Sequence, residues 1–141
     1  MRAFLPGQDE HLAHELIQEA FQISQPFAEW EHAFTHESFD PTLWFFALDG
    51  QHVAGAIFCY NDNPKMGWIW DLAIRIPWRR RGIGMALLQH AFNEFYTRGQ
   101  RTIGLDVNAE NQTGATQLYR HVGMQRVQEY YTYDKELRQQ T

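Results

Sequence analysis

The sequence predicts an α/β domain in which helices flank a mixed, mainly antiparallel sheet. Segments with apolar residues at helical spacing alternate with short apolar segments that are typical of strands. One strand–helix–strand unit, at residues 68–107, requires a right-handed crossover, so its two strands are expected to be parallel neighbours. Asp49-Gly50 lies between two apolar segments and predicts a hairpin. With 141 residues, the chain is expected to form one domain, residues 1–141.

Two helices are expected before the hairpin. A short strand at residues 2–5 comes first. Asp9 is expected to cap the first helix, because it precedes apolar residues at helical spacing. The second helix is expected over residues 24–38, and Asp40-Pro41 ends it.

The hairpin leads into the first strand of the crossover unit. Residues 43–48 and 53–60 predict the two hairpin strands. Residues 61–67 are rich in turn-forming residues and predict a loop. A strand is then expected over residues 68–75.

The second half of the chain completes the order β-α-α-β-β-β-α-β-α-β. A long amphipathic helix follows Gly82 and ends at Gly99, the residue type that commonly follows a helix. Residues 102–107 predict an apolar strand, residues 113–121 a short helix, and residues 128–134 a final strand.

Charge is distributed unevenly along this chain of net charge −5. Residues 1–50 hold nine acidic residues and one basic residue, whereas residues 51–141 hold eight acidic and eleven basic ones. Four of the bases lie between Arg75 and Arg81. Nucleic-acid binding needs a broad basic face, so this compact cluster argues against it. It suits a small polyanion, and the acidic N-terminal part suits a cationic partner.

The sequence also bears on compartment and membranes. No apolar segment approaches the ~18 residues that span a bilayer, so no membrane association is expected. The N-terminus lacks the apolar core of a signal peptide. Cys59 is the single cysteine, which excludes an intrachain disulfide. A cytoplasmic location is the expectation that follows.

The turn after the strand at 68–75 carries the strongest functional signal. Three arginines precede Gly82-Ile83-Gly84 at the start of a helix. The helix dipole already makes this end positive, so added positive charge predicts a bound anion. Free backbone N–H groups and arginines bind phosphates well, which indicates a ligand that carries a pyrophosphate. The third glycine of the dinucleotide-binding fingerprint is missing.

These residues resemble a known family. The segment Arg79-Arg80-Arg81-Gly82-Ile83-Gly84 is similar to the (Gln/Arg)-x-x-Gly-x-(Gly/Ala) signature of the GCN5-related N-acetyltransferases, the GNAT superfamily. A second block, from Asn111 to Tyr119 and followed by Gly123-Met124, also looks like that family. The motifs cover residues 66–134.

The resemblance implies a GNAT fold and acetyl-CoA as co-substrate, with no metal. The strand that contains Leu72, Ala73 and Ile74 would have a bulge, splay from residues 102–107 and hydrogen-bond the pantetheine arm. Backbone N–H groups of the turn and helix start would bind the pyrophosphate. The implied cofactor-binding residues are Leu72, Ala73, Ile74, Arg79, Arg80, Arg81, Gly82, Ile83, Gly84, Met85, Ala86, Asn111 and Tyr119.

The resemblance also implies roles in catalysis. The Ile74 N–H would polarise the acetyl carbonyl and stabilise the oxyanion. Tyr119 would protonate the leaving thiolate; its structural alternative is a packed helix aromatic. The general base is left open among Asp71, Asp106 and a water chain. Asp71 and Asp106 are expected to raise each other's pKa if they lie at adjacent strand ends.

The expected acceptor is a primary amine, either a small molecule or a peptide N-terminus, and it is expected to carry a positive charge. The alternatives are a non-catalytic acyl-CoA-binding sensor, one half of a tandem-domain enzyme, or transfer to oxygen or sulfur. A homodimer is compatible with the family. The histidine pairs His11/His14 and His32/His36 are interpreted as surface residues rather than metal ligands, and Cys59 as a buried filler.

Overall fold

The computed structural model describes residues 1–22, 24–31, 34, 39–63, 66–106, 125–126 and 132–137. Within these residues, short 3₁₀ helices at Pro41–Leu43 and Ile76–Trp78 accompany the main elements. The main elements are β1 (Arg2–Ala3), α1 (Glu10–Phe21), α2 (Phe27–Trp30), β2 (Trp44–Asp49), β3 (His52–Asn63), β4 (Met66–Ile74), α3 (Ile83–Thr97), β5 (Thr102–Asp106), β6 (Gln125–Arg126) and β7 (Thr132–Glu136).

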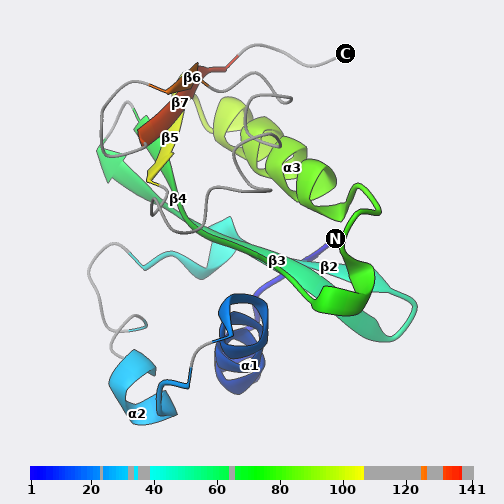
Figure 1. Cartoon of the computed structure of the whole chain (residues 1–141). Helices are drawn as coiled ribbons and strands as arrows, with labels where there is room; N and C mark the ends of the chain where they lie inside the picture. The colour runs from blue at the N-terminus through cyan, green and yellow to red at the C-terminus, as the bar shows by residue number, and fades with distance from the viewer. Residues whose placement is uncertain are drawn as a thin grey trace.

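The strands form one sheet in the order β1-β2-β3-β4-β5-β7-β6. Strands β4 and β5 are parallel, and every other neighbouring pair in the described sheet is antiparallel. Helix α3 covers one face, and α1 with α2 lies on the other (Figure 1). The predicted class, a mixed and mostly antiparallel sheet between helices, is therefore confirmed.

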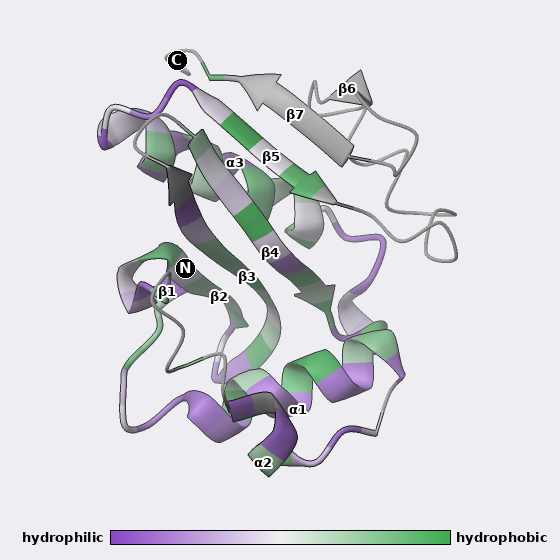
Figure 2. Cartoon of the chain, turned by 90° about the vertical axis from the view of Figure 1, so that its left-hand side faces the viewer, coloured by the Kyte–Doolittle hydropathy of each residue, from purple (hydrophilic) through white to green (hydrophobic). Residues whose placement is uncertain are grey.

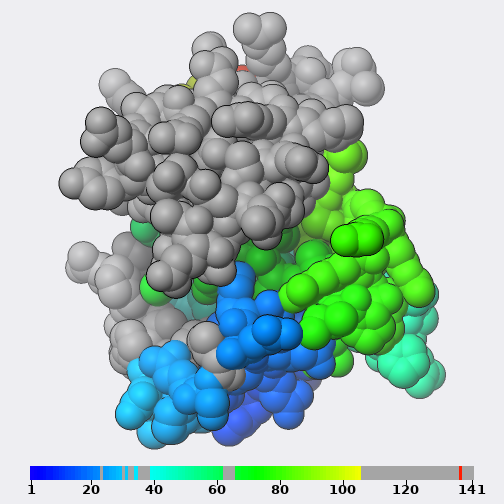
Figure 3. Space-filling view, in the orientation of Figure 1, coloured from blue at the N-terminus to red at the C-terminus, as the bar shows by residue number. Residues whose placement is uncertain are grey.

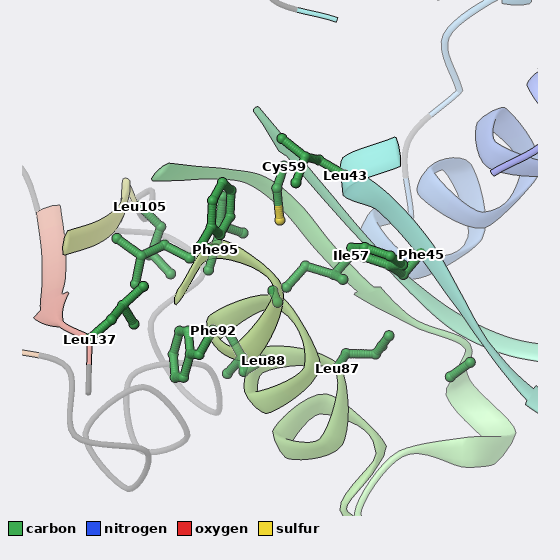
Figure 4. Packing of buried hydrophobic residues seen from close by; sticks show 14 residues of the cluster. Leu43, Phe45, Ile57, Cys59, Leu87, Leu88, Phe92, Phe95, Leu105 and Leu137 are labelled. Carbon is green, nitrogen blue, oxygen red and sulfur yellow. The ribbon is translucent and has the colours of Figure 1, made fainter. Parts of the chain in front are cut away.

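The α3 face of the sheet holds the larger core (Figure 4). Apolar residues recur at helical spacing along α3, so one side of the helix is buried against β2, β3, β4 and β5. Cys59 on β3 belongs to this core and is fully buried, which confirms its interpretation as a filler. The buried residues of α3 are Leu87, Leu88, Ala91, Phe92 and Phe95.

A second core lies between the sheet and α1. Helix α1 buries Ala13, Leu16 and Ile17. They belong to one cluster with Phe58 of β3 and Ala73 of β4. The two faces of β4 therefore pack against different helices, and side chains that alternate along the strand are assigned to one helix or the other.

Local signals predicted the hairpin and α3 correctly. The hairpin closes with Asp49 opposite His52, and Gly50 adopts a left-handed φ of 63°. Helix α3 begins after Gly82 and ends at Thr97, with Arg98 as its C-cap, followed by Gly99 at φ 90°. Both ends use the glycine conformations that those turns need.

The expected loop over residues 61–67 is wrong. Strand β3 extends to Asn63 and β4 begins at Met66, with Asn61 paired to Gly67. Gly67 lies against α3, where an added Cβ would stand 2.7 Å from the ring of Phe95. Gly67 is therefore not a turn residue but a strand residue, and its lack of a side chain allows α3 to approach the sheet closely.

Three further expectations need correction. The second helix begins at Phe27 rather than at residue 24, because Pro26 biases the residue before it toward extended backbone. Of the expected helix, positions 32–33 and 35–38 lie outside the described residues. The final strand β7 is described over Thr132–Glu136 rather than residues 128–134, and an unexpected short strand β6 pairs with it; residues 128–131 lie outside the described residues. Asp9 occupies the N-cap position of α1 but makes no cap hydrogen bond there.

The Asp9 carboxylate instead contacts residues that precede α1 in the sequence. It accepts hydrogen bonds from Arg2 Nη1 at 2.6 Å, Arg2 Nη2 at 3.1 Å and the Leu5 N–H at 2.7 Å. Burial alone would raise the pKa of Asp9, but these bonds outweigh it and lower the pKa. The ion pair therefore fixes the end of β1 to the start of α1. In the described part of the chain, no helix has the length and apolar content to cross a membrane.

Candidate active site

Strand β4 changes its surroundings halfway along. Its pairing with β5 runs from Met66↔Thr102 to Ile69↔Leu105 and ends there. Its pairing with β3 continues to Ile74. From Trp70 onward, β4 therefore has β3 on one side and an edge without described strand partners on the other (Figure 2). The parallel pair that the resemblance implies is present over these residues, and the chain after Asp106 lies outside the described part.

A β-bulge coincides with this point. Cys59 pairs with Ile69 and Phe58 pairs with Asp71, so Trp70 is the extra residue of β4. A bulge bends its strand and places two residues opposite one. Trp70 and Asp71 therefore lie on the same face as Phe58, the face toward α1. The resemblance implied a bulge in this strand, but its position at Trp70 was not predicted.

Ring contacts agree with this orientation of Trp70. Its ring lies edge-on to those of Tyr60, at 5.4 Å between centroids, and Trp44, at 6.5 Å. Trp44 belongs to the core under α1. Trp70 is nonetheless 38% exposed. The bulge thus places an accessible indole beside the Asp71 carboxyl.

The backbone of β4 presents donors to the open edge. The Arg75 N–H donates to the Ala54 carbonyl of β3 at 2.9 Å. In an antiparallel ladder, the amide groups of successive residues point to opposite sides. The N–H groups of Leu72 and Ile74 therefore point away from β3, into the space between β4 and β5. A carbonyl held in that space would accept hydrogen bonds there.

Asp71 lies on β4 just past the last β4–β5 pair. Asp71 as a whole remains partly exposed to solvent, but its carboxyl group is buried, and this burial raises the pKa of Asp71 to about 7. A carboxyl with that pKa is well matched to take a proton near neutral pH. Asp106 is the last residue of β5, and its side chain lies outside the described part of the chain. Its effect on the pKa of Asp71 therefore stays a prediction.

The chain leaves β4 through the turn Ile76–Trp78 and enters α3 at Gly82. The Ala86 N–H donates to the Gly82 carbonyl at 3.0 Å, the first bond of the helix. The four preceding N–H groups, from Gly82 to Met85, thus have no intrahelical acceptor. No side chain caps them, and the first turn of α3 has no acidic residue. An anion can bind at such an end.

The three arginines of the turn differ. Arg79 donates from Nη2 to the Ala20 carbonyl of α1 at 2.7 Å and from Nε to the Ile74 carbonyl at 3.1 Å. Arg80 and Arg81 are exposed, and Arg80 has a left-handed φ of 65°. Arg80 and Arg81 are therefore the cations of this turn that are available to an anion at α3. Sequence reasoning treated the three arginines alike.

Comparison with known proteins assigns the family. The model of the acetyltransferase (GNAT) family matches residues 10–124. This chain belongs to the GNAT family. N-alpha-acetyltransferase 30 of Schizosaccharomyces pombe is 30% identical over 124 residues, which cover 84% of this chain and 79% of that protein. The chain spans only 39% of the human protein of the same name. The named relatives are N-acetyltransferases, so the expected enzyme class is confirmed.

Solved structures agree with the GNAT fold. A GCN5-related N-acetyltransferase from Sphaerobacter thermophilus is 40% identical with a TM-score of 0.80. The match covers 98% of this chain but only 44% of that one. A NatC complex bound to Gag peptide and CoA matches 97% of both chains with a TM-score of 0.76, at 20% identity, which shows the fold alone.

Several implied GNAT site residues lie outside the described residues. They are Asn111, Tyr119 and the side chain of Asp106. Their roles stay predictions. The described part of the site therefore consists of the open edge of β4, Asp71 and the start of α3.

The remaining candidates have structural surroundings. His11 stacks on Phe27 at 3.9 Å between centroids, and His14 approaches the same ring edge-on at 5.5 Å, so both tie α1 to α2. Trp78 donates from Nε1 to Asp49 at 2.9 Å, which fixes the turn after β4 to the hairpin. His32 and His36 lie outside the described residues. Among those described, no group of three or more potential metal ligands was found.

Proposed function

We propose that this chain transfers the acetyl group of acetyl-CoA to a primary amine, in particular the α-amine of a peptide or protein N-terminus. One observation carries the proposal. Within the described residues, the edge of β4 beyond Ile69 has no strand partner and leads directly into a helix start without a side-chain cap, beside the exposed Arg80 and Arg81. A single continuous segment thereby offers donors for an amide-rich arm and, next to them, a site for phosphates.

Acetyl-CoA fits these features in sequence. The pyrophosphate would accept hydrogen bonds from the N–H groups of residues 82–85, with Arg80 and Arg81 nearby to neutralise its charge. The pantetheine arm would lie along residues 72–74 and take the place that β5 occupies lower on the strand. Its amides would continue the hydrogen-bond pattern of the sheet. The thioester at the end of the arm would lie along this edge, and the Ile74 N–H is the proposed donor to its carbonyl.

The chemistry follows from direct attack. The amine nitrogen forms a bond to the thioester carbon, and the carbonyl oxygen, now negative, accepts from the Ile74 N–H. A carboxylate, Asp71 or Asp106, or water takes the proton that the amine must lose. The C–S bond then breaks, and Tyr119 gives a proton to the departing thiolate. No metal enters this sequence of steps.

Two observations support an amine that is cationic before it reacts. Residues 1–50 hold nine acidic residues against one basic residue, which attracts an ammonium group. Asp71 and Trp70 lie together on the face toward α1, so an acceptor would approach from that face. A relative that acetylates N-terminal amines, as the name N-alpha-acetyltransferase 30 states, favours a peptide over a small molecule.

The test measures binding and turnover separately. Calorimetry with acetyl-CoA gives the affinity, and a thiol-reactive dye detects CoA release with a panel of peptides, polyamines and amino acids. The proposal predicts release that depends on peptides with a free α-amine. Release with polyamines alone would contradict the peptide assignment. Binding without release from any acceptor would favour the non-catalytic sensor, and absence of binding would overturn the phosphate site.

Gly82→Asp and Gly99→Asp form a matched pair for the phosphate site. Both glycines have a left-handed φ, 79° and 90°, and both have open space where a Cβ would stand. The two variants therefore carry the same backbone strain and the same charge at opposite ends of α3. Gly82→Asp is expected to weaken acetyl-CoA binding about 100-fold or more through charge repulsion, and Gly99→Asp to leave it nearly unchanged.

A further inference from the structure

We propose that Arg79 is a positioning residue that ties the C-terminal end of α1 to the open edge of β4. In this role it fixes the direction of the Ile74 N–H, the proposed oxyanion donor, relative to α1, the helix on the face from which the acceptor amine would approach. The inference rests on the proposed function for its catalytic consequence, whereas the tie itself is a property of the free protein. Arg79 would then act through protein contacts rather than as a phosphate ligand.

The geometry of Arg79 is the first argument. One guanidinium reaches two elements, since Nη2 donates to Ala20 of α1 at 2.7 Å and Nε donates to Ile74 of β4 at 3.1 Å. In the space-filling view, α1 in blue and the segment around the start of α3 in green lie against each other (Figure 3). A second link runs parallel to the first, with Arg75 Nε 3.7 Å from Glu19 Oε2.

Helix α1 needs a cation at this end. Ala20 lies in its last turn, where carbonyl groups have no intrahelical donor and the helix dipole is negative. The last turn of α1 contains no basic residue of its own. Arg79 supplies that charge from a segment 59 residues further along the chain. The position of α1 is therefore coupled to the turn that follows β4.

The edge of β4 needs the same residue for a different reason. The Ile74 carbonyl points to the side that β5 has left, so the sheet supplies no described donor for it. Arg79 Nε satisfies this carbonyl and restrains the peptide plane after Ile74. The N–H of the same residue points into the gap, where its direction determines how well it meets the oxyanion. Arg79 therefore restrains this donor without touching the reacting atoms.

The neighbouring arginines provide a natural contrast. Within the described part of the chain, no hydrogen bond or ion pair involves Arg80 or Arg81, and both are exposed. Phosphate binding is thus available to these two side chains, whereas the guanidinium of Arg79 is held by two carbonyl groups, those of Ile74 and Ala20. Removing Arg79 and removing Arg81 should consequently change different kinetic constants.

The test compares Arg79→Gln with Arg81→Gln, at a temperature where circular dichroism shows each variant to be folded. Arg79→Gln is expected to lower kcat about tenfold or more and to keep the KM for acetyl-CoA within about twofold. Arg81→Gln is expected to raise that KM and to change kcat little. If Arg79→Gln instead raises the KM for acetyl-CoA and leaves kcat unchanged, Arg79 is a phosphate ligand and the proposal is wrong.

A second readout needs no acetyl-CoA and no turnover. Hydrogen exchange at the last turn of α1 and at Arg75, whose N–H shares a peptide plane with the Ile74 carbonyl and donates to Ala54, is measured in the free protein. Arg79→Gln is expected to speed exchange there about tenfold, with other amides unchanged, and Arg79→Lys to restore part of the protection. Unchanged exchange at both places overturns the tie. Absence of CoA release by the unmodified protein would overturn the proposed function alone, because this readout stands without it.

Discussion

The two halves of β4 have the same strand conformation but different neighbours. From Met66 to Ile69 the strand is paired on both sides and lies within the sheet. From Trp70 to Ile74 it is paired on one side, and its other edge faces the gap. The amide groups of the first half pair within the described sheet, whereas those of the second half that face away from β3 have no described strand partner. In the proposed function these amide groups bind the ligand, so one strand would supply both a scaffold and a binding surface.

The boundary between the halves is one residue. Trp70 adds a position to β4 without adding one to β3, and the strand bends where β5 departs. In a regular strand Ile69 and Asp71, two positions apart, would lie on the same face. The extra residue between them places them on opposite faces instead, as if they were consecutive residues of a strand without the insertion. A bulge can therefore open the edge of a strand without disturbing either core.

Deletion of Trp70 would break this comparison most directly. Ile69 and Asp71 would become consecutive, with the alternation of β4 intact, so the fold is expected to persist. The straightened strand would displace Ile74, and loss of alignment is expected to lower kcat about 100-fold or more. Circular dichroism and CoA release would be measured together. A folded deletion variant with full activity would show that the bulge has no role in catalysis.

Asp71→Asn tests the chemistry of the second half. Loss of a general base is expected to lower kcat/KM about 100-fold near neutral pH. Burial raises the pKa of Asp71 to about 7, so the kcat/KM profile of the unmodified enzyme should fall below that pH. The measurement is kcat/KM from pH 5 to 9 for both proteins, with Asp106→Asn as the alternative base. A profile that keeps the same fall in Asp71→Asn would remove Asp71 as the base.

Gly67→Ala tests the first half and should affect stability instead of chemistry. Its Cβ would stand 2.7 Å from the ring of Phe95, so the helix or the ring must move. We expect the free energy of unfolding to fall by about 2 kcal/mol, as for other overpacked sites. Urea unfolding gives the stability, and CoA release at low temperature gives the activity. A large loss of kcat in the folded variant would mean that the halves are not separate in function.

Asp71 also makes a smaller prediction about stability. Its pKa is higher in the folded state than in the unfolded chain, so the folded state binds the proton more tightly between about pH 4 and 7. The contribution to stability is present at low pH and is lost as the pH rises through the folded pKa. Asp71→Asn should therefore be more stable than the parent at pH 8, by on the order of 1 kcal/mol or more, and similar at pH 4. Equal stability at both values would contradict a buried carboxyl.

The sequence predicted the features that depend on local residues. Gly82, Gly99 and Asp49-Gly50 mark their turns through conformations that few other residues adopt, and the apolar spacing of α3 indicates a helix regardless of its partners. Anion binding at the turn before α3 is a prediction of the same local kind, since arginines at a helix start conflict with its dipole, and it still awaits a test.

Features that depend on distant partners were missed. Gly67 resembles a loop residue unless Phe95 is known to pack on it. The bulge at Trp70 follows from the register with β3, which apolar alternation alone does not specify. Arg79 is one of three adjacent arginines in the sequence, and its contact with Ala20 distinguishes it. Tertiary pairing decides each of these.

The central claim is that the Ile74 N–H serves the reaction while its neighbours serve the sheet. Replacing the amide of Ile74 by an ester removes this one donor, and the same change at Ala73 removes a donor that faces β3. The ester at Ile74 is expected to lower kcat about 100-fold with little change in acetyl-CoA affinity. The ester at Ala73 should lower stability by about 1 kcal/mol and leave kcat nearly unchanged. Unchanged kcat with the ester at Ile74 would contradict the account.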